Sequence, residues 1–149
     1  HFQLDHPSLL QRFSANIKHV KNVIGPLGQI LVEQHGFYQG CVNIKYAAFL
    51  PYVHAVRLLS IKEGIYETST LDRMNQLIRI KKYEKILKNC ERNFLDLLKY
   101  RVSLMQIENY TDTQYLRIRN LSTEERKEIK RILKDGKRLH EEVMALTSS

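Results

Sequence analysis

The sequence predicts an all-α fold, a mainly antiparallel bundle of about five helices with one small β-hairpin inserted after the first helix. Two observations lead to this prediction. Apolar residues recur at helical spacing over several long stretches, and the only short β-rich runs lie together within residues 30–46. The composition agrees, because 43% of the 149 residues are hydrophobic and charged residues are interspersed among them, as in a single folded domain.

The first expected helix spans residues 7–24. Pro7 stands in its first turn, where a missing N–H group costs nothing, and Gly25-Pro26 stops it. We expect residues 1–25 to link the chain to a missing upstream domain and residues 26–149 to form the helical domain itself. The chain begins at His1 without a methionine, which suggests a piece of a longer polypeptide.

Two short β-rich runs follow the first helix. Residues 30–33 and residues 41–46 flank a segment that contains two glycines, so they predict a two-stranded hairpin. An isolated hairpin is only marginally stable in water. We therefore expect it to pack on the bundle or on a missing domain.

Two helices are expected next. Pro51 lies in the first turn of one helix over residues 49–63, which Gly64 ends. Its expected inward residues are Leu50, Val53, Val56 and Ile61. Ser69, with Asp72 three residues later, resembles a capping box and predicts a short helix that runs to Ile78.

A long central helix is expected over residues 82–106, around which the bundle would be organised. Its apolar residues recur in steps of three and four, which places them on one side of a helix. They are Tyr83, Leu87, Cys90, Phe94, Leu97 and Leu104. Arg101 interrupts this seam, so its guanidinium group must find a carboxylate, a backbone carbonyl, a ligand or solvent.

The last part of the chain predicts a long connection and a final helix. Residues 108–121 are rich in Asn, Thr and Asp, and residues 114–118 within them are expected to pack as an extended arm. Ser122 and Glu125 form a capping box that opens the final helix. Its expected buried residues are Ile129, Ile132, Leu133, Leu139, Val143 and Leu146. Its outer face should carry the ion pairs Glu124–Lys127, Glu128–Arg131 and Arg138–Glu141.

The net charge of +8 is concentrated in the middle of the chain, where residues 71–119 hold eleven Lys and Arg against six Asp and Glu. Its densest part consists of Arg79, Lys81, Lys82, Lys85 and Lys88. Such a cluster can attract phosphates or an acidic partner. A solvated helix face is the plainer interpretation.

No apolar run approaches the ~20 residues that a membrane-spanning helix needs. The two cysteines, Cys41 and Cys90, lack the spacing of a zinc site or a disulfide framework, which is compatible with a reducing cytosol. We therefore expect a cytoplasmic protein.

Signatures of catalysis are absent from the sequence, which has no P-loop, HExxH or GxSxG motif. It also lacks the Gly-Ser turn and Asp-x-Asp pair that nucleotidyl transfer on magnesium uses. The histidines show no pair at metal-ligand spacing on one helix face. One enzyme alternative remains: Arg12 and His19 stand two turns apart on the first helix, as in some small helical ribonucleases, although Phe13 replaces their usual Asn or Asp.

Short motifs occur in a particular order between Pro26 and Leu121. They are Pro26-Leu27-Gly28, Asn43-Ile44-Lys45, residues 51–57 (PYVHAVR), residues 68–74 (TSTLDRM), Phe94-Leu95 with Arg101, Asn109-Tyr110 and Leu121-Ser122. This order and spacing resemble the nucleotidyltransferase substrate-binding domain, a helical module at the C-terminal end of bacterial signalling proteins. The resemblance covers most of the chain.

In that family the module follows a catalytic domain similar to that of the protein-PII uridylyltransferase, often with cystathionine-beta-synthase (CBS) type or cyclic-nucleotide-binding domains further upstream. The resemblance implies a non-catalytic, substrate-binding or regulatory domain of a bacterial signal-transduction nucleotidyltransferase. This fragment alone would then be no enzyme and would hold no cofactor. The catalytic residues, Mg²⁺ and the nucleoside triphosphate would belong to the full-length protein.

The same resemblance implies which partners to expect. They are the upstream nucleotidyltransferase domain and a nucleotide or a protein acceptor, without a membrane or nucleic acid. A protein-interaction or dimerisation bundle, including a homodimer, is the main alternative.

Four cations are the expected substrate- or phosphate-binding residues. Lys45 and Arg57 fall at positions matched to the family, and Arg73 follows a helix start whose free N–H groups can hold a phosphate. Arg101 is the charged member of the apolar seam. For each of the four the alternative is a structural ion pair between helices, with Asp72 and Asp96 as available partners, and we favour this alternative for Arg57 and Arg101. No catalytic or metal-ligating residue is expected.

The sequence departs from the family pattern at two positions. His54 stands where the family usually has Asp or Asn, and Asn43 stands where it usually has Asp. Both changes remove an acid, which puts any cation or amine contact of those acids in doubt here.

Overall fold

The computed structural model describes residues 23–107 and 114–148. In chain order they form β1 (Cys41–Asn43), the π-helical turn η2 (Lys45–Phe49), α2 (Leu50–Glu63), α3 (Thr70–Ile78), the 3-10 turn η3 (Lys81–Tyr83), α4 (Cys90–Ile107), β2 (Tyr115–Arg117), the 3-10 turn η5 (Ile118–Asn120) and α5 (Thr123–Thr147). The predicted mostly helical fold with a small antiparallel sheet is confirmed. Most of the expected first helix, with Arg12 and His19, lies outside the described residues, and Ile24 at its expected end forms a β-bridge with Ile30 instead.

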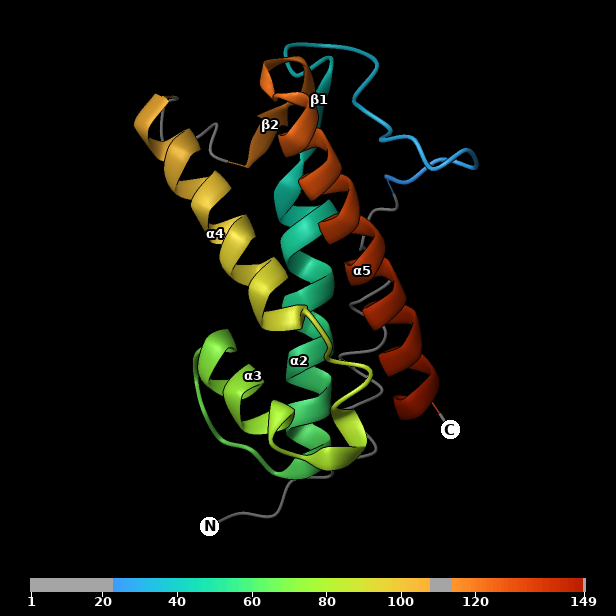
Figure 1. Cartoon of the computed structure of the whole chain (residues 1–149), viewed down its shortest axis with the longest axis vertical. Coiled ribbons are helices and arrows are strands. Elements are labelled where there is room, and N and C mark those ends of the chain that lie inside the picture. The colour runs from blue at the N-terminus through green and yellow to red at the C-terminus, as the bar shows by residue number, and fades with distance from the viewer. Residues whose placement is uncertain (1–22, 108–113, 149) are drawn as a thin grey trace.

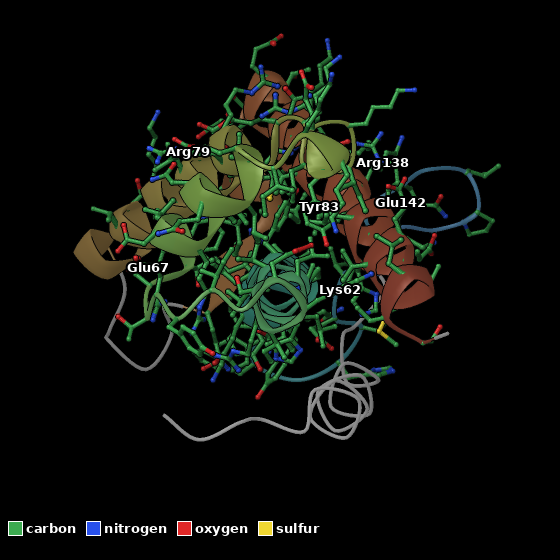
Figure 2. The ribbon with its side chains drawn as sticks, turned by 90° about the horizontal axis from the view of Figure 1, so that it is seen from below. Lys62, Glu67, Arg79, Tyr83, Arg138 and Glu142 are labelled. Atoms are coloured by element: carbon green, nitrogen blue, oxygen red, sulfur yellow. The ribbon has the colours of Figure 1, made fainter. Side chains whose placement is uncertain are left out.

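The bundle is organised around α2 rather than around the predicted helix 82–106. Figure 1 shows α2 between α4 and α5, with α3 near its lower end and the small sheet at the other end. Figure 2, seen from below, shows α2 almost end-on with α3 and α5 on two sides of it. Its most enclosed residues are at most 1% exposed, namely Tyr52, Ala55, Val56, Leu58 and Leu59. Burial over so much of its circumference explains why α2 lacks a single apolar stripe.

The central helix begins later than predicted. α4 starts at Cys90, after residues 84–89 form turns that end with Asn89 in the left-handed conformation (φ 65°), which interrupts a right-handed helix. The prediction from residue 82 was wrong because it weighed apolar spacing alone. Four lysines within residues 81–88 would repel one another at helical spacing and oppose the positive end of the helix dipole.

The apolar seam of that segment is confirmed despite the later helix start. Tyr83, Leu87, Cys90, Phe94 and Leu97 are all buried, whereas the side chain of Leu104 lies outside the described residues. The basic cluster of residues 79–88 is exposed. One of its members, Lys82, lies 2.6 Å from a carboxylate oxygen of Glu63, which also accepts a hydrogen bond from the Tyr83 hydroxyl at 2.7 Å.

The predicted hairpin between residues 30–33 and 41–46 is only partly confirmed: Glu33 N donates to Cys41 O and Gly40 N to Glu33 O, both at 2.9 Å, but residues 30–33 form no strand. β1 pairs antiparallel with β2, with Val42 opposite Leu116, and residues 45–49 continue as η2 rather than as strand. Every β1 residue is buried, and Leu116 is 5% exposed.

The predicted helix ends are largely confirmed. Gly64 ends α2 at φ 69°, the Ser69 hydroxyl accepts a hydrogen bond from Asp72 N at 3.1 Å, and Ser122 and Glu125 form the complete capping box of α5. The predicted inward faces were partly wrong. Leu50, Val53 and Ile61 of α2 are only partly buried, and Leu146 of α5 is 42% exposed.

A buried polar network joins α2, α4 and α5. The Tyr52 hydroxyl donates to Ile132 O at 2.6 Å, and Asn93 Nδ2 donates to the Tyr52 hydroxyl at 3.2 Å and to Asp135 Oδ2 at 2.9 Å. Arg131 Nε donates to Asn93 Oδ1 at 3.3 Å. Because each of these buried groups has a partner, the network fixes how the three helices are aligned.

None of the helices in the described residues combines the length and the apolar character that crossing a membrane requires.

Candidate functional site

A pocket of about 480 Å³ lies between α4, β2 and the first turns of α5, and the loop before β1 completes its lining. Its volume is in the range of small-molecule binding sites. It forms near the end of the bundle that carries the small sheet in Figure 1. The β1–β2 pairing therefore positions one of its walls.

Aromatic rings form one part of the lining. The rings of Tyr38 and Tyr115 stack with centroids 3.7 Å apart and an interplanar angle of 5°, and Phe37 meets Tyr38 edge-on at 5.1 Å. Phe37 is 81% exposed. Stacked tyrosines bordering a pocket offer a flat surface for a planar ring.

Three carboxylates and two cations also line the pocket, but they differ in how far their charge is compensated. Asp96 lies 3.1 Å from Arg131 Nη2 and 3.6 Å from Lys99 Nζ. Glu125 Oε1 accepts a hydrogen bond from Ser122 N at 2.9 Å in the capping box. Glu128 accepts one from the Tyr100 hydroxyl at 3.0 Å and, among the described residues, forms no ion pair. Among the described residues, Glu125 and Glu128 thus have uncharged hydrogen-bond donors only, whereas Asp96 has two cationic partners.

The Tyr100–Glu128 hydrogen bond connects α4 to α5 at the pocket. Burial and the bonded Glu128 carboxylate raise the pKa of Tyr100 well above its usual value of 10.0. The phenol therefore stays protonated around neutral pH and keeps donating to Glu128. The predicted ion pair between Glu128 and Arg131 was wrong. Glu128 bonds to Tyr100, and Arg131 bonds to Asp96 and Asn93 on α4.

The other expected ion pairs on α5 were only partly correct. Glu124 lies 3.9 Å from Lys127, as predicted. Arg138 lies 3.9 Å from Asp135 and from Glu142, rather than from the expected Glu141. All of these are surface contacts that contribute little to stability.

The four predicted cations do not line the pocket. Burial lowers the pKa of Arg73 of α3, and the charge of Arg57 of α2 lowers it further. The two guanidinium groups therefore lie near each other. Arg73 Nε donates to Glu67 O at 2.7 Å, so this guanidinium group has a structural role in holding the loop before α3.

The remaining two predicted cations lie over aromatic rings. Lys45, the first residue of η2, has its Nζ 5.5 Å from the ring centroid of the next residue, Tyr46. Arg101 of α4 has its Cζ 5.8 Å from the ring centroid of Phe49 at the end of η2. Asp96, which was expected as a partner for Arg101, pairs with Arg131 and Lys99 instead. The phosphate-binding role of the four cations stays a prediction.

Asn43 and His54, which were expected to depart from the family pattern, lie in different surroundings. Asn43 Oδ1 accepts a hydrogen bond from Tyr46 N at 3.4 Å at the start of η2. The pKa of His54 of α2 is lowered by burial, then by Arg57, and to a smaller extent by the nearby His140 of α5. Neither His54 Nδ1 nor His140 Nε2 has a hydrogen-bond partner among the described residues.

Sequence reasoning missed the tyrosines and Glu128 of the pocket. Tyr115 was expected only as part of an extended arm, and Tyr100 was assigned no role. The signal in the sequence that could have pointed to the pocket was Glu128, a carboxylate near the start of the final helix. Its expected partner, Arg131, could pair with other acids instead.

Nowhere in residues 23–107 and 114–148 do three or more His, Cys, Asp or Glu side chains come together in a way that could hold a metal ion. The three pocket acids are therefore spread along the lining rather than gathered as a chelate.

Comparison with known protein families finds a match that spans residues 7–145. Neither a curated protein nor a solved structure shows significant similarity to the chain. The match includes α2 to α5 and both strands, so all the elements that line the pocket belong to the matched region. The chain therefore belongs to the family described as "Putative nucleotidyltransferase substrate binding domain".

Proposed function

We propose that this chain is the non-catalytic, substrate-binding domain of a bacterial signal-transduction nucleotidyltransferase, and that the pocket between α4, β2 and α5 holds the nucleotide. The catalytic domain, similar to that of the protein-PII uridylyltransferase, would lie upstream in the same polypeptide. Mg²⁺ would act there together with the nucleoside triphosphate. The protein would work in the cytoplasm.

The observation that supports this proposal is the mixed lining of the pocket. The Tyr38–Tyr115 stack provides a surface for a base, and Lys99 and Arg117 provide cations for phosphates. A volume of about 480 Å³ is enough for a nucleotide. Because the family is described as substrate-binding, we expect the pocket to bind a substrate of the nucleotidyltransferase.

The test is calorimetric titration of the chain with ATP, UTP and cyclic AMP, with and without Mg²⁺, at low salt. Ser103 lines the pocket from α4, so Ser103→Trp should fill it and weaken binding at least about tenfold, since a blocked site loses its contacts outright. Val102→Trp is the matched control, because Val102 is 53% exposed and does not line the pocket.

Binding that is equally strong in Ser103→Trp would overturn the pocket as the nucleotide site. In that case, Arg57→Ala and Arg101→Ala would show whether the predicted cations hold the ligand. Absence of saturable binding for every nucleotide would overturn the nucleotide role itself, leaving acceptor recognition or self-association as the alternatives.

A further inference from the structure

We propose that the pocket selects its nucleotide by an exocyclic amino group on the base, so that adenine, cytosine and guanine nucleotides bind in preference to uracil nucleotides. This inference rests on the proposed function of the pocket as the nucleotide site. It goes further by stating which bases the lining accepts and which residue discriminates between them.

Stacking alone would not discriminate. Every base has an aromatic face, so the Tyr38–Tyr115 surface accepts all four bases with similar strength. Selection must therefore come from groups that bind the edge of the base. The lining offers carboxylates for this purpose.

Glu128 is the carboxylate best suited to bind a neutral donor. It is half-buried, its described hydrogen bond comes from the uncharged Tyr100 hydroxyl, and no described cation forms an ion pair with it. The bond to Tyr100 orients the carboxylate while leaving further acceptor sites open. Asp96 is less suited, because Arg131 and Lys99 already contact its two oxygens. Glu125 is less suited because its bond from Ser122 N turns it back to the start of α5 in the capping box, whereas the partner of Glu128, Tyr100, itself lines the pocket.

An ionised carboxylate can only accept hydrogen bonds. The exocyclic amino groups of adenine, cytosine and guanine donate them, as in the contacts of Glu and Asp with cytosine N4. Uracil presents a carbonyl oxygen where cytosine has its amino group. Placing that oxygen against Glu128 would bring two acceptors together, and the one donor on that edge of uracil, N3–H, is flanked by two such oxygens.

The cations of the pocket are placed to bind the phosphates rather than the base. The Lys99 side chain is 81% exposed, so its ammonium group lies at the solvent edge, and its contact with Asp96 is a weak surface pair. Arg117 is held in place because its Nη1 donates to Gln39 O at 3.2 Å. Base and phosphates thus have separate partners.

The experiment is titration of the chain with AMP, CMP, GMP and UMP by calorimetry. We expect the three amino-bearing monophosphates to bind at least about tenfold more tightly than UMP. In Glu128→Gln the side chain can still accept from Tyr100, but it now also carries donors that suit the uracil carbonyl. The preference over UMP should therefore fall towards one or reverse.

Glu124→Gln is the matched control, because it makes the same change on the same helix at a side chain that is 85% exposed and outside the pocket. Its base preference should equal that of the unmodified chain. Melting curves of both variants show whether each is folded.

The outcomes separate this inference from the proposed function. If UMP binds as tightly as AMP and CMP, and Ser103→Trp abolishes all of this binding, the base preference is refuted while the pocket remains the nucleotide site. An unchanged preference in folded Glu128→Gln also refutes the assigned role of Glu128. If no monophosphate binds in a manner that Ser103→Trp weakens, both proposals fail.

Discussion

Gly136 is the residue on which the close packing of α5 against α2 depends. A Cβ atom at this position would lie 2.8 Å from Cε2 of Tyr52, whose ring is buried and whose hydroxyl bonds to Ile132 O. Such a distance is too short for carbon atoms in contact. Glycine is needed at position 136 because its missing side chain leaves room for the Tyr52 ring, and not because the backbone turns there.

We expect Gly136→Ala to destabilise the fold. Alanine in place of a mid-helix glycine gains about 1 kcal/mol of helix propensity, whereas overpacking against a buried ring costs about 1–3 kcal/mol. The net loss should be about 1 kcal/mol in the free energy of unfolding, measured by urea denaturation.

The exposed neighbour Lys137 provides the control, since Lys137→Ala should leave stability nearly unchanged. A Gly136→Ala variant as stable as the unmodified chain would mean that α5 can shift away from Tyr52 without cost.

Burial of single apolar residues was largely predictable, but the polar partners were not. Tyr83, Leu87 and Phe94 are buried, as their spacing required. Glu128 was assigned to Arg131 because local spacing reveals only partners on the same helix. Its actual partner, Tyr100, comes from another helix, and only the packing of α4 on α5 brings them together.

At the scale of elements, capping residues were the most informative local signal. Ser69, Gly64 and Ser122 set helix ends correctly because each acts through hydrogen bonds or backbone angles within a few residues. The start of α4 was missed because the apolar period continues across the break at Asn89. The four lysines of residues 81–88 could have indicated the later start, because they disfavour a helix N-terminus at this place.

The contact between α2 and α5 predicts how stability depends on pH. Burial is the largest cause that lowers the pKa of His54 and of His140 below the usual 6.5. As the pH falls below about 6.5, both histidines are protonated more readily in the unfolded chain than in the folded chain. The free energy of unfolding should therefore fall as the pH drops from 7 towards 5. Chemical denaturation at several pH values measures this fall.

In His54→Gln and His140→Gln the dependence between pH 7 and 5 should become shallower. Glu63 provides an internal comparison, because the hydrogen bonds from Lys82 and Tyr83 lower its pKa below 4.5. Its contribution is present above that pH and is lost only as the pH falls further. A stability that stays constant from pH 7 to 5, or a slope unchanged in both histidine variants, would contradict the assignment.

For the whole molecule, the fold class followed from the sequence but the strand partner did not. Helical periodicity is local, whereas the pairing of Val42 with Leu116 joins segments on either side of α2, α3 and α4. Nothing in the short run 115–117 identifies which other strand it meets. The pocket was missed for the same reason, since it exists only where these distant segments adjoin.

The β1–β2 ribbon should be less stable than the helical core. It consists of three residue pairs that close a long stretch of chain, whereas α2 is enclosed by other elements. Amide hydrogen exchange should be faster for residues 41–43 and 115–117 than for residues 55–59, as measured by mass spectrometry. Equal protection of both regions would show that the ribbon and α2 open only together.

The ribbon also has a consequence for the order in which the protein becomes competent during its synthesis. Translation runs through β1, α2, α3 and α4 before it reaches β2 and α5, so Tyr115 and Glu128 are among the last of the pocket's side chains to be made. The pocket can therefore form only after α4, β2 and the first turns of α5 have all been made. Binding at this site reports that translation has passed β2 and the first turns of α5, so an incomplete chain cannot compete for the ligand.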